Sequence, residues 1–186
     1  RLNRMGHQTS LFGYRVFRHP LEQIAAEFAS HIESVRSTIP SNGAGEHPAP
    51  YVIIGHSLGN IIARMALPTL EEPPHQLVML GPPNNSPLLA RRLKNRNLFR
   101  LLTGNAGLHM ATPEFYENLP IPQMPTLVIA GSAGPKGRLS PFGQDDSDGI
   151  VAVAETRLKG AQHAVIPGVH TFLMDHPQTY SLICQF

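Results

Sequence analysis

The chain has 186 residues, of which 41% are hydrophobic and 15% charged, and its formal net charge is +2. We expect one domain over residues 1–186, because this length can bury a substantial core and the composition is that of an ordinary globular protein. The small charge gives no support for nucleic acid as a partner. No apolar run approaches the roughly 20 residues of a membrane span, so no integral membrane segment is expected. Oligomeric state and compartment stay open.

Short apolar runs alternate along the chain with stretches of helical periodicity. Strands are expected over residues 7–12, 51–54, 76–80, 125–131 and 164–166; helices are expected from Pro20 to near Pro40, over 60–66, from 86–87, and from about Pro177. The alternation favours a mainly parallel sheet covered by helices on both faces, which is a three-layer α/β sandwich. The single cysteine, Cys184, excludes an intrachain disulfide, and its apolar surroundings predict a buried thiol.

The pentapeptide Gly55-His56-Ser57-Leu58-Gly59 stands between an expected strand and an expected helix. Its glycines remove side chains where a strand-to-helix turn is tightest, so Ser57 can project its hydroxyl above the carboxyl edge of the sheet. This context predicts a nucleophilic serine. His56 is expected to be a packing or surface histidine, because adjacent residues on a tight turn face different directions.

A nucleophilic serine needs a base to take its proton and an acid to orient that base. In a strand-to-helix elbow of this type the chain order is serine, acid, histidine. The loop after the strand at 125–131 holds Asp145, Asp146 and Asp148, whereas Asp175 comes too late. We favour Asp148, since the apolar pair that follows Gly149 can anchor its loop; Asp145 and Asp146 remain alternatives.

Three histidines follow these acids in the chain: His163, His170 and His176. His163 stands at the start of an expected strand, which is the wrong end of the sheet, and His176 directly precedes the start of the last helix. His170 follows the strand and a Pro-Gly turn, at the carboxyl edge where the base must lie. His170 is therefore the favoured base.

Four segments together resemble the α/β-hydrolase superfamily: residues 55–59 (GHSLG), 80–86 (LGPPNNS), 147–151 (SDGIV) and 168–172 (GVHTF). Within it the chain is similar to the small bacterial lipases and esterases that are grouped with inositol-deacylase-like proteins. The resemblance implies Ser57 as nucleophile, Asp148 as acid and His170 as base. It also implies that the Leu58 backbone N–H is one oxyanion donor.

The resemblance also implies a departure from the family pattern. Members carry, before the position of Arg1, a strand whose His-Gly loop gives the second oxyanion N–H, and this chain lacks it. An N-terminally truncated α/β-hydrolase fold is therefore expected. Either the strand at 7–12 pairs directly with the elbow strand, or the sheet has a gap between them.

The motifs predict a carboxylic ester hydrolase that works through an acyl-enzyme on a small-molecule ester or lipid, with no cofactor and no metal. Pro82, Pro83 and Asn84 are candidate substrate-binding residues, because they leave a strand at the catalytic edge. The acyl pocket is expected along residues 82–89 and 98–110.

Three other interpretations were weighed against ester hydrolysis. Residues 144–149 with Glu155 partly match an EF-hand calcium loop, but residues 140–143 cannot form its entering helix. The glycine-rich residues 131–137 lack the lysine-containing end of a phosphate loop. The remaining alternative is a non-catalytic binding domain or an inactive fragment with the same fold.

Overall fold

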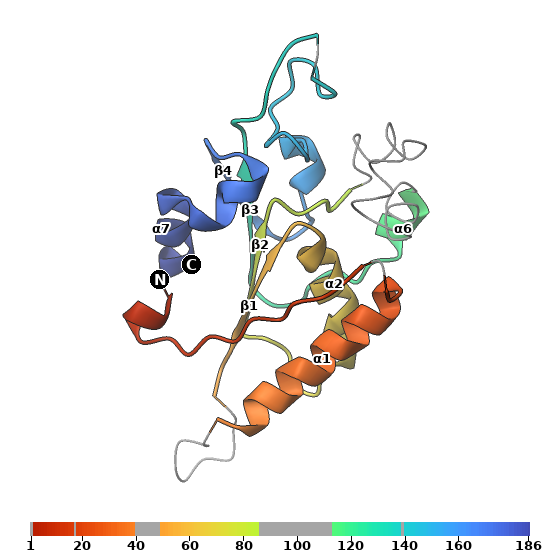
Figure 1. Ribbon diagram of the computed structural model, residues 1–186, viewed down its shortest axis with the longest axis vertical. Helices are drawn as coiled ribbons and strands as arrows, with labels where there is room; N and C mark the ends of the chain where they lie inside the picture. Colours follow the sequence, from red (N-terminus) through yellow and green to blue (C-terminus); the bar gives the residue numbers. More distant parts are fainter. Residues whose placement is uncertain (1, 17, 40–48, 86–112, 139) are drawn as a thin grey trace.

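A parallel four-stranded sheet with the order β1-β2-β3-β4 forms the centre of the molecule (Figure 1). The computed structural model describes residues 2–16, 18–39, 49–85, 113–138 and 140–186. The strands are β1 (Val52–His56), β2 (Gln76–Leu80), β3 (Thr126–Gly131) and β4 (Gln162–Ile166). These four strands confirm the predictions from Tyr51 onwards to within a few residues at each end.

The helices that were expected to flank the sheet are confirmed in three cases. They are α1 (Leu21–Ser37), α2 (Leu58–Ala66) and α7 (Pro177–Gln185). The structure also contains the short α6 (Pro113–Glu117) and the 3₁₀ turns η1 (Leu2–Met5), η2 (Leu67–Thr69), η3 (Val153–Thr156) and η4 (His170–Asp175). The helix expected from residues 86–87 lies outside the described residues. None of the helices described is long and apolar enough to cross a membrane.

Alternate residues of the strands pack on opposite faces of the sheet. One face carries Leu77, Met79 and Val128, which pack with Ile53 of β1 against residues of α1 and α2. The other face carries Val78, Leu80 and Ile129, which pack against η4 and α7. Burial on both faces explains why β2 and β3 are continuous apolar runs in the sequence, whereas β1 and β4 at the edges of the sheet are partly exposed. The three-layer α/β architecture is therefore confirmed, with α1 and α2 on one side of the sheet and α7 on the other (Figure 1).

The prediction of a strand at residues 7–12 is wrong. This segment is extended but joins no strand of the described sheet, and side chains hold it against α1 instead. The Ser10 hydroxyl lies 2.8 Å from His31 Nε2, and the Phe12 ring centre lies 5.1 Å from that of Phe28. Aromatic and polar contacts with α1 therefore hold this segment in place of the backbone hydrogen bonds of a sheet.

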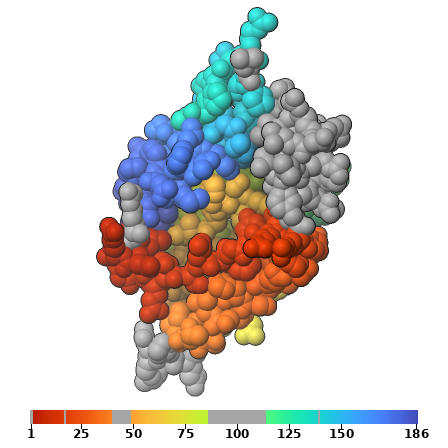
Figure 2. All heavy atoms as spheres, in the orientation of Figure 1, coloured from red at the N-terminus to blue at the C-terminus, as the bar shows by residue number. Residues whose placement is uncertain are grey.

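A cleft of about 450 Å³ separates the N-terminal segment from β1. It is lined by residues of that segment, of α1 and of the whole of β1. Direct pairing of residues 7–12 with the elbow strand is therefore not found, and β1 is an edge strand of the described sheet. Figure 2 shows the gold surface around β1 and α2 open between the red N-terminal segment and the blue C-terminal elements.

The prediction of a buried Cys184 is also wrong, since its side chain is exposed. The helical period of α7 turns Leu182, Ile183 and Phe186 toward the sheet, where they pack against the core. Cys184 lies between these positions and faces outward.

Candidate active site

Ser57 lies at the junction of β1 and α2 in a strained backbone conformation. Its φ of 53° and ψ of −125° make it the one non-glycine residue with positive φ in the part of the chain that the structure describes. Such a conformation costs on the order of 1–3 kcal/mol and persists only where the surroundings enforce it. Its N–H donates to the Leu80 carbonyl at 3.0 Å, so the end of β2 holds the turn.

The two glycines of the elbow are not equivalent. A Cβ on Gly55 would collide with the side chain of Asn60, so a side chain is excluded there. A Cβ on Gly59 would meet only the Tyr14 hydroxyl, at 3.8 Å, among the described residues. The tight packing expected at both positions is therefore found at the first.

Asn60 fastens the elbow to β2 from inside the protein. Its side chain is fully buried, and its Nδ2 donates to the carbonyls of Ser57 at 3.0 Å and Leu80 at 3.1 Å. The Leu80 carbonyl thus accepts from both the Ser57 backbone and the Asn60 amide. These bonds keep the strained turn in place.

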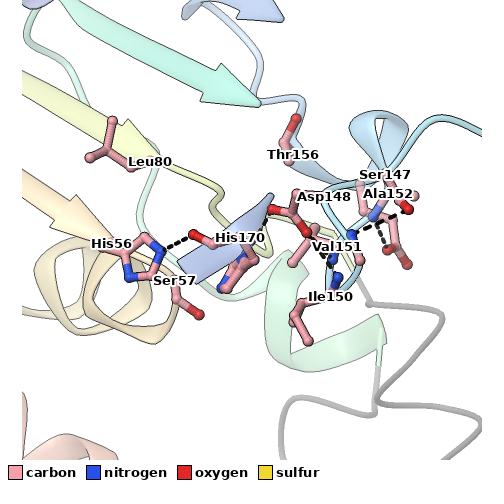
Figure 3. A network of polar contacts seen from close by, with 12 residues as sticks. His56, Ser57, Leu80, Ser147, Asp148, Ile150, Val151, Ala152, Thr156 and His170 are labelled. Carbon is pink, nitrogen blue, oxygen red and sulfur yellow. Dashed lines mark hydrogen bonds and ion pairs between the residues drawn. The ribbon is translucent and has the colours of Figure 1, made fainter. Parts of the chain in front are cut away.

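Asp148 and His170 form a buried hydrogen-bonded pair. Asp148 Oδ2 lies 2.7 Å from His170 Nδ1, and the two residues are 2% and 8% exposed. Asp148 Oδ1 accepts from the backbone N–H groups of Ile150 at 2.9 Å and Val151 at 2.7 Å (Figure 3). Because a carboxylate only accepts, His170 donates through Nδ1, and Nε2 of the neutral ring is left as a proton acceptor.

The Asp148–His170 pair and the Ser57 elbow meet at the end of β2. A Cβ on Gly81 would lie 3.0 Å from Asp148 Oδ2 and 3.1 Å from His170 Nδ1, while the preceding carbonyl of Leu80 accepts from Ser57. Figure 3 shows Ser57 together with His170 and Asp148 in one polar group. No hydrogen bond joins the Ser57 hydroxyl to His170 among the residues described.

Two glycines that sequence reasoning did not single out make room for this pair. Besides Gly81, whose φ is 51°, Gly131 at the end of β3 lies so close that a Cβ would collide with the Gly168 carbonyl and approach Asp148 Cβ to 2.8 Å. The available signal was a glycine at the carboxyl end of two neighbouring strands, where a side chain from another segment must enter.

The alternative acids lie apart from His170. Asp145 and Asp146 are exposed, and Asp146 forms an ion pair with Lys136 at 2.6 Å. Residues 140–143 form a bend and a turn where an EF-hand would require its entering helix, and both oxygens of Asp148 accept from protein groups. These contacts argue against the calcium interpretation.

The alternative histidines have other partners. His163 Nε2 lies 2.8 Å from the Thr156 hydroxyl near the start of β4, and burial followed by the charge of Arg157 lowers the pKa of His163. His176 Nδ1 accepts from the Gln178 backbone N–H at 3.2 Å, at the beginning of α7. Of the three candidates, His170 is the one in contact with a candidate acid.

The candidate substrate-binding residues are buried in the scaffold. Pro82 and Pro83 are buried, and Asn84 is 3% exposed, with its Nδ2 donating to the Thr156 carbonyl at 2.8 Å. The Asn84 Oδ1 accepts from Arg64 Nη1 at 3.3 Å. Substrate contact by these three residues remains a prediction, and the greater part of the expected acyl pocket, residues 86–89 and 98–110, lies outside the described residues.

Arg64 is a buried cation that sequence reasoning missed. It is 2% exposed, and it donates through Nε to the Pro120 carbonyl at 2.9 Å and through Nη2 to the Leu119 carbonyl at 3.0 Å. Burial lowers the pKa of Arg64 to about 10. Together with its bond to Asn84, these contacts tie α2 to the segments that follow β2 and α6.

Replacing Arg64 with methionine is expected to lower the free energy of unfolding by about 3 kcal/mol. Methionine fills similar space but leaves two buried acceptors, on Asn84 and Leu119, and one half-buried acceptor, on Pro120, without the donor they have now. Urea unfolding measures the change, and the exposed Arg138 replaced with methionine is the control, expected within about 0.5 kcal/mol of wild type. Equal stability of the two variants would contradict the assigned role.

Neither a family model nor a curated protein sequence matches the chain. Its structure is similar to the mature lipase BlEst2 of Bacillus licheniformis, with a TM-score of 0.67 at 16% identity over 89% of this chain and 73% of the lipase chain.

Two further solved structures have the same architecture. The phospholipase PlaB of Legionella pneumophila matches with a TM-score of 0.64 at 16% identity, over 92% of this chain but 48% of its own. A thermophilic esterase matches with a TM-score of 0.54 at 14% identity, over 97% of this chain and 77% of its own. Identities this low bear on the fold alone. The parallel sheet, the strand-to-helix elbow and these neighbours together show that the chain has the α/β-hydrolase fold.

Proposed function

We propose that this protein is a serine hydrolase of carboxylic esters, with Ser57 as nucleophile, His170 as general base and Asp148 as the acid that orients the base. The observation that carries the proposal is the buried 2.7 Å bond between Asp148 and His170 beside a strained serine elbow. Strain at a single serine and a buried acid–histidine pair are independent features. Their meeting at one strand end is what nucleophilic catalysis requires.

The proposed reaction is acyl transfer from an ester to water. His170 Nε2 takes the hydroxyl proton as Ser57 Oγ bonds to the carbonyl carbon, and the carbonyl oxygen becomes an oxyanion. The C–O bond to the alcohol then breaks, and the imidazolium returns its proton to the departing oxygen. Water, deprotonated by the same base, cleaves the acyl-enzyme and releases the carboxylic acid and free Ser57.

Leu58 is the proposed source of one oxyanion donor. It is the first residue of α2, so its backbone N–H belongs to the first turn, where a helix offers no acceptor of its own. The positive end of the helix dipole adds to the stabilisation of a negative charge at this place. One such donor is typically worth about 10²–10³ in rate.

The substrate class is proposed to be small-molecule esters or lipids. The similar structures include a lipase, a phospholipase and an esterase by name, which supports ester chemistry in general. Pro82, Pro83 and Asn84 are the proposed substrate-binding residues, since they follow the carboxyl end of β2, and Asn84 also connects this segment to η3 through its bond to the Thr156 carbonyl. No cofactor or metal takes part in the steps above.

Labelling with a fluorophosphonate probe tests the proposal directly, because only an activated serine attacks the phosphorus. The native protein is expected to be labelled at Ser57, as mapped by peptide mass spectrometry, and to hydrolyse p-nitrophenyl acetate and butyrate. Heat-unfolded protein is the control and should remain unlabelled. Native protein that is neither labelled nor active would favour the alternative, a non-catalytic domain of the same fold.

A further inference from the structure

His56 makes a long-range contact with the segment that carries His170. Its Nε2 lies 2.9 Å from the backbone carbonyl oxygen of His170, although the residues are 114 positions apart in sequence. The two imidazole rings also pack together, with centroids 4.8 Å apart and planes inclined by 43° (Figure 3). The sequence had suggested only a packing or surface residue at position 56.

The direction of this hydrogen bond follows from its partners. A carbonyl oxygen only accepts, so Nε2 of His56 carries the proton. Burial lowers the pKa of His56, and the neighbouring His170 acts in the same direction, while the hydrogen bond to His170 and the Asp148 charge oppose them. The ring is therefore neutral near pH 7, protonated on Nε2 and unprotonated on Nδ1.

His170 is held at three points, and His56 supplies one of them. Its backbone N–H donates to the Asp148 carbonyl at 2.9 Å, its Nδ1 donates to the Asp148 carboxylate at 2.7 Å, and its carbonyl accepts from His56. Val169 is 37% and Phe172 63% exposed, and the nearest side chain of η4 that is fully buried in the core is Leu173, three residues after His170. Without His56, both remaining anchors of His170 would come from Asp148.

We propose that His56 is a positioning residue, whose N–H fixes the main chain of His170 and so aims the imidazole at Ser57. This inference rests on the proposed function, because it assigns His56 a part in the same reaction. His56 ends β1 and directly precedes Ser57, so one strand end sets the places of both nucleophile and base. A base displaced by about 1 Å can lose about 10²-fold in rate, which makes such an anchor measurable.

Two substitutions separate the hydrogen bond from the ring packing. His56→Phe keeps a ring against His170 and removes the donor, whereas His56→Gln removes the ring and keeps an N–H at about the reach of Nε2. We expect His56→Phe to lower kcat about 10- to 100-fold with KM little changed, and His56→Gln to recover to within about 3-fold of wild type. His75→Phe, at an exposed position before β2, is the matched control.

Hydrogen exchange provides a readout that does not depend on activity. The His170 amide donates to the Asp148 carbonyl, so loosening of the segment should raise its exchange rate in His56→Phe by about 10-fold and leave it unchanged in His56→Gln. If His56→Phe does not fold, His56→Asn replaces it, because that amide is too short to reach the carbonyl. Exchange at amides of β2 and β3 reports whether each variant remains folded.

The outcomes distinguish the two proposals. Unchanged kcat and exchange in His56→Phe would overturn the positioning role, and a loss confined to His56→Gln would assign the effect to ring packing. Equal losses in the two variants would also overturn it, because the N–H that His56→Gln retains would then have no effect. The esterase proposal alone would be overturned if the wild-type protein showed neither ester hydrolysis nor labelling. The anchoring role would still stand if exchange of the His170 amide were faster in His56→Phe than in wild type and unchanged in His56→Gln.

Discussion

Replacing Ser57 with alanine is expected to lower kcat for p-nitrophenyl ester hydrolysis by about 10⁶-fold, to a rate set by the remaining groups alone. Alanine has no oxygen to form the acyl-enzyme, and His170 would then have no hydroxyl proton to remove. Such a variant should also resist fluorophosphonate labelling. Steady-state kinetics at saturating substrate measure the change, with active-site titration of the wild type to count competent molecules.

Stability measurements on the same position separate chemistry from folding. Alanine retains the strained φ of 53°, so Ser57→Ala should unfold at nearly the wild-type urea concentration. Ser57→Gly should be equally inactive but more stable by about 1 kcal/mol, because glycine adopts positive φ without that strain. Turnover by Ser57→Ala within about 10-fold of wild type would exclude Ser57 as the nucleophile.

The strands of the core could be predicted because each is a short apolar run, as strands of a parallel sheet covered by helices usually are. β2 was expected at its observed bounds, since residues 76–80 are an apolar run between two loops and the strand is buried on both faces. Chain order then pointed to Asp148 and His170, because Asp148 lies in the loop after β3 and His170 follows the carboxyl end of β4. The contact between these two side chains is thus a consequence of topology.

The failures come from contacts between distant segments. The sequence of residues 7–12 predicts a strand, but such a segment forms one only where the edge of another strand is available for hydrogen bonding. Here Phe12 packs on α1 instead. The roles of His56 and Arg64 depend on carbonyls 114 and 56 positions away, at His170 and Pro120, which no local pattern encodes. Side chains that bond to distant backbone leave little trace in a single sequence.

Asn60 shows the same limit within the elbow itself. Helical periodicity explained why residues 60–66 form a helix, but it gave no reason for an asparagine at a fully buried position. The reason is its two bonds to carbonyls of the elbow and of β2. A buried polar residue directly after a strained turn is the pattern that could have indicated it, since buried amides are nearly always hydrogen-bonded.

Asp148→Asn is expected to lower kcat by about 10⁴-fold while the fold is preserved. Two backbone N–H groups, of Ile150 and Val151, donate to Oδ1 and will retain an oxygen there. The new NH₂ group must then take the place of Oδ2 and face His170 Nδ1. An amide N–H in that position donates, so it selects the imidazole tautomer with its proton on Nε2.

That tautomer cannot accept the proton of Ser57, and this is why a substitution of one atom should nearly abolish turnover. Nitrogen NMR of His170 can test the cause as well as the effect, because the proton should move from Nδ1 in wild type to Nε2 in Asp148→Asn. Asp146→Asn is the matched control, since Asp146 lies in an exposed ion pair with Lys136, and its kcat should stay within about 2-fold. A large loss of kcat in Asp146→Asn, together with a nearly active Asp148→Asn, would transfer the role of the acid to Asp146. The carboxylate that orients His170 is the one whose replacement moves the imidazole proton from Nδ1 to Nε2.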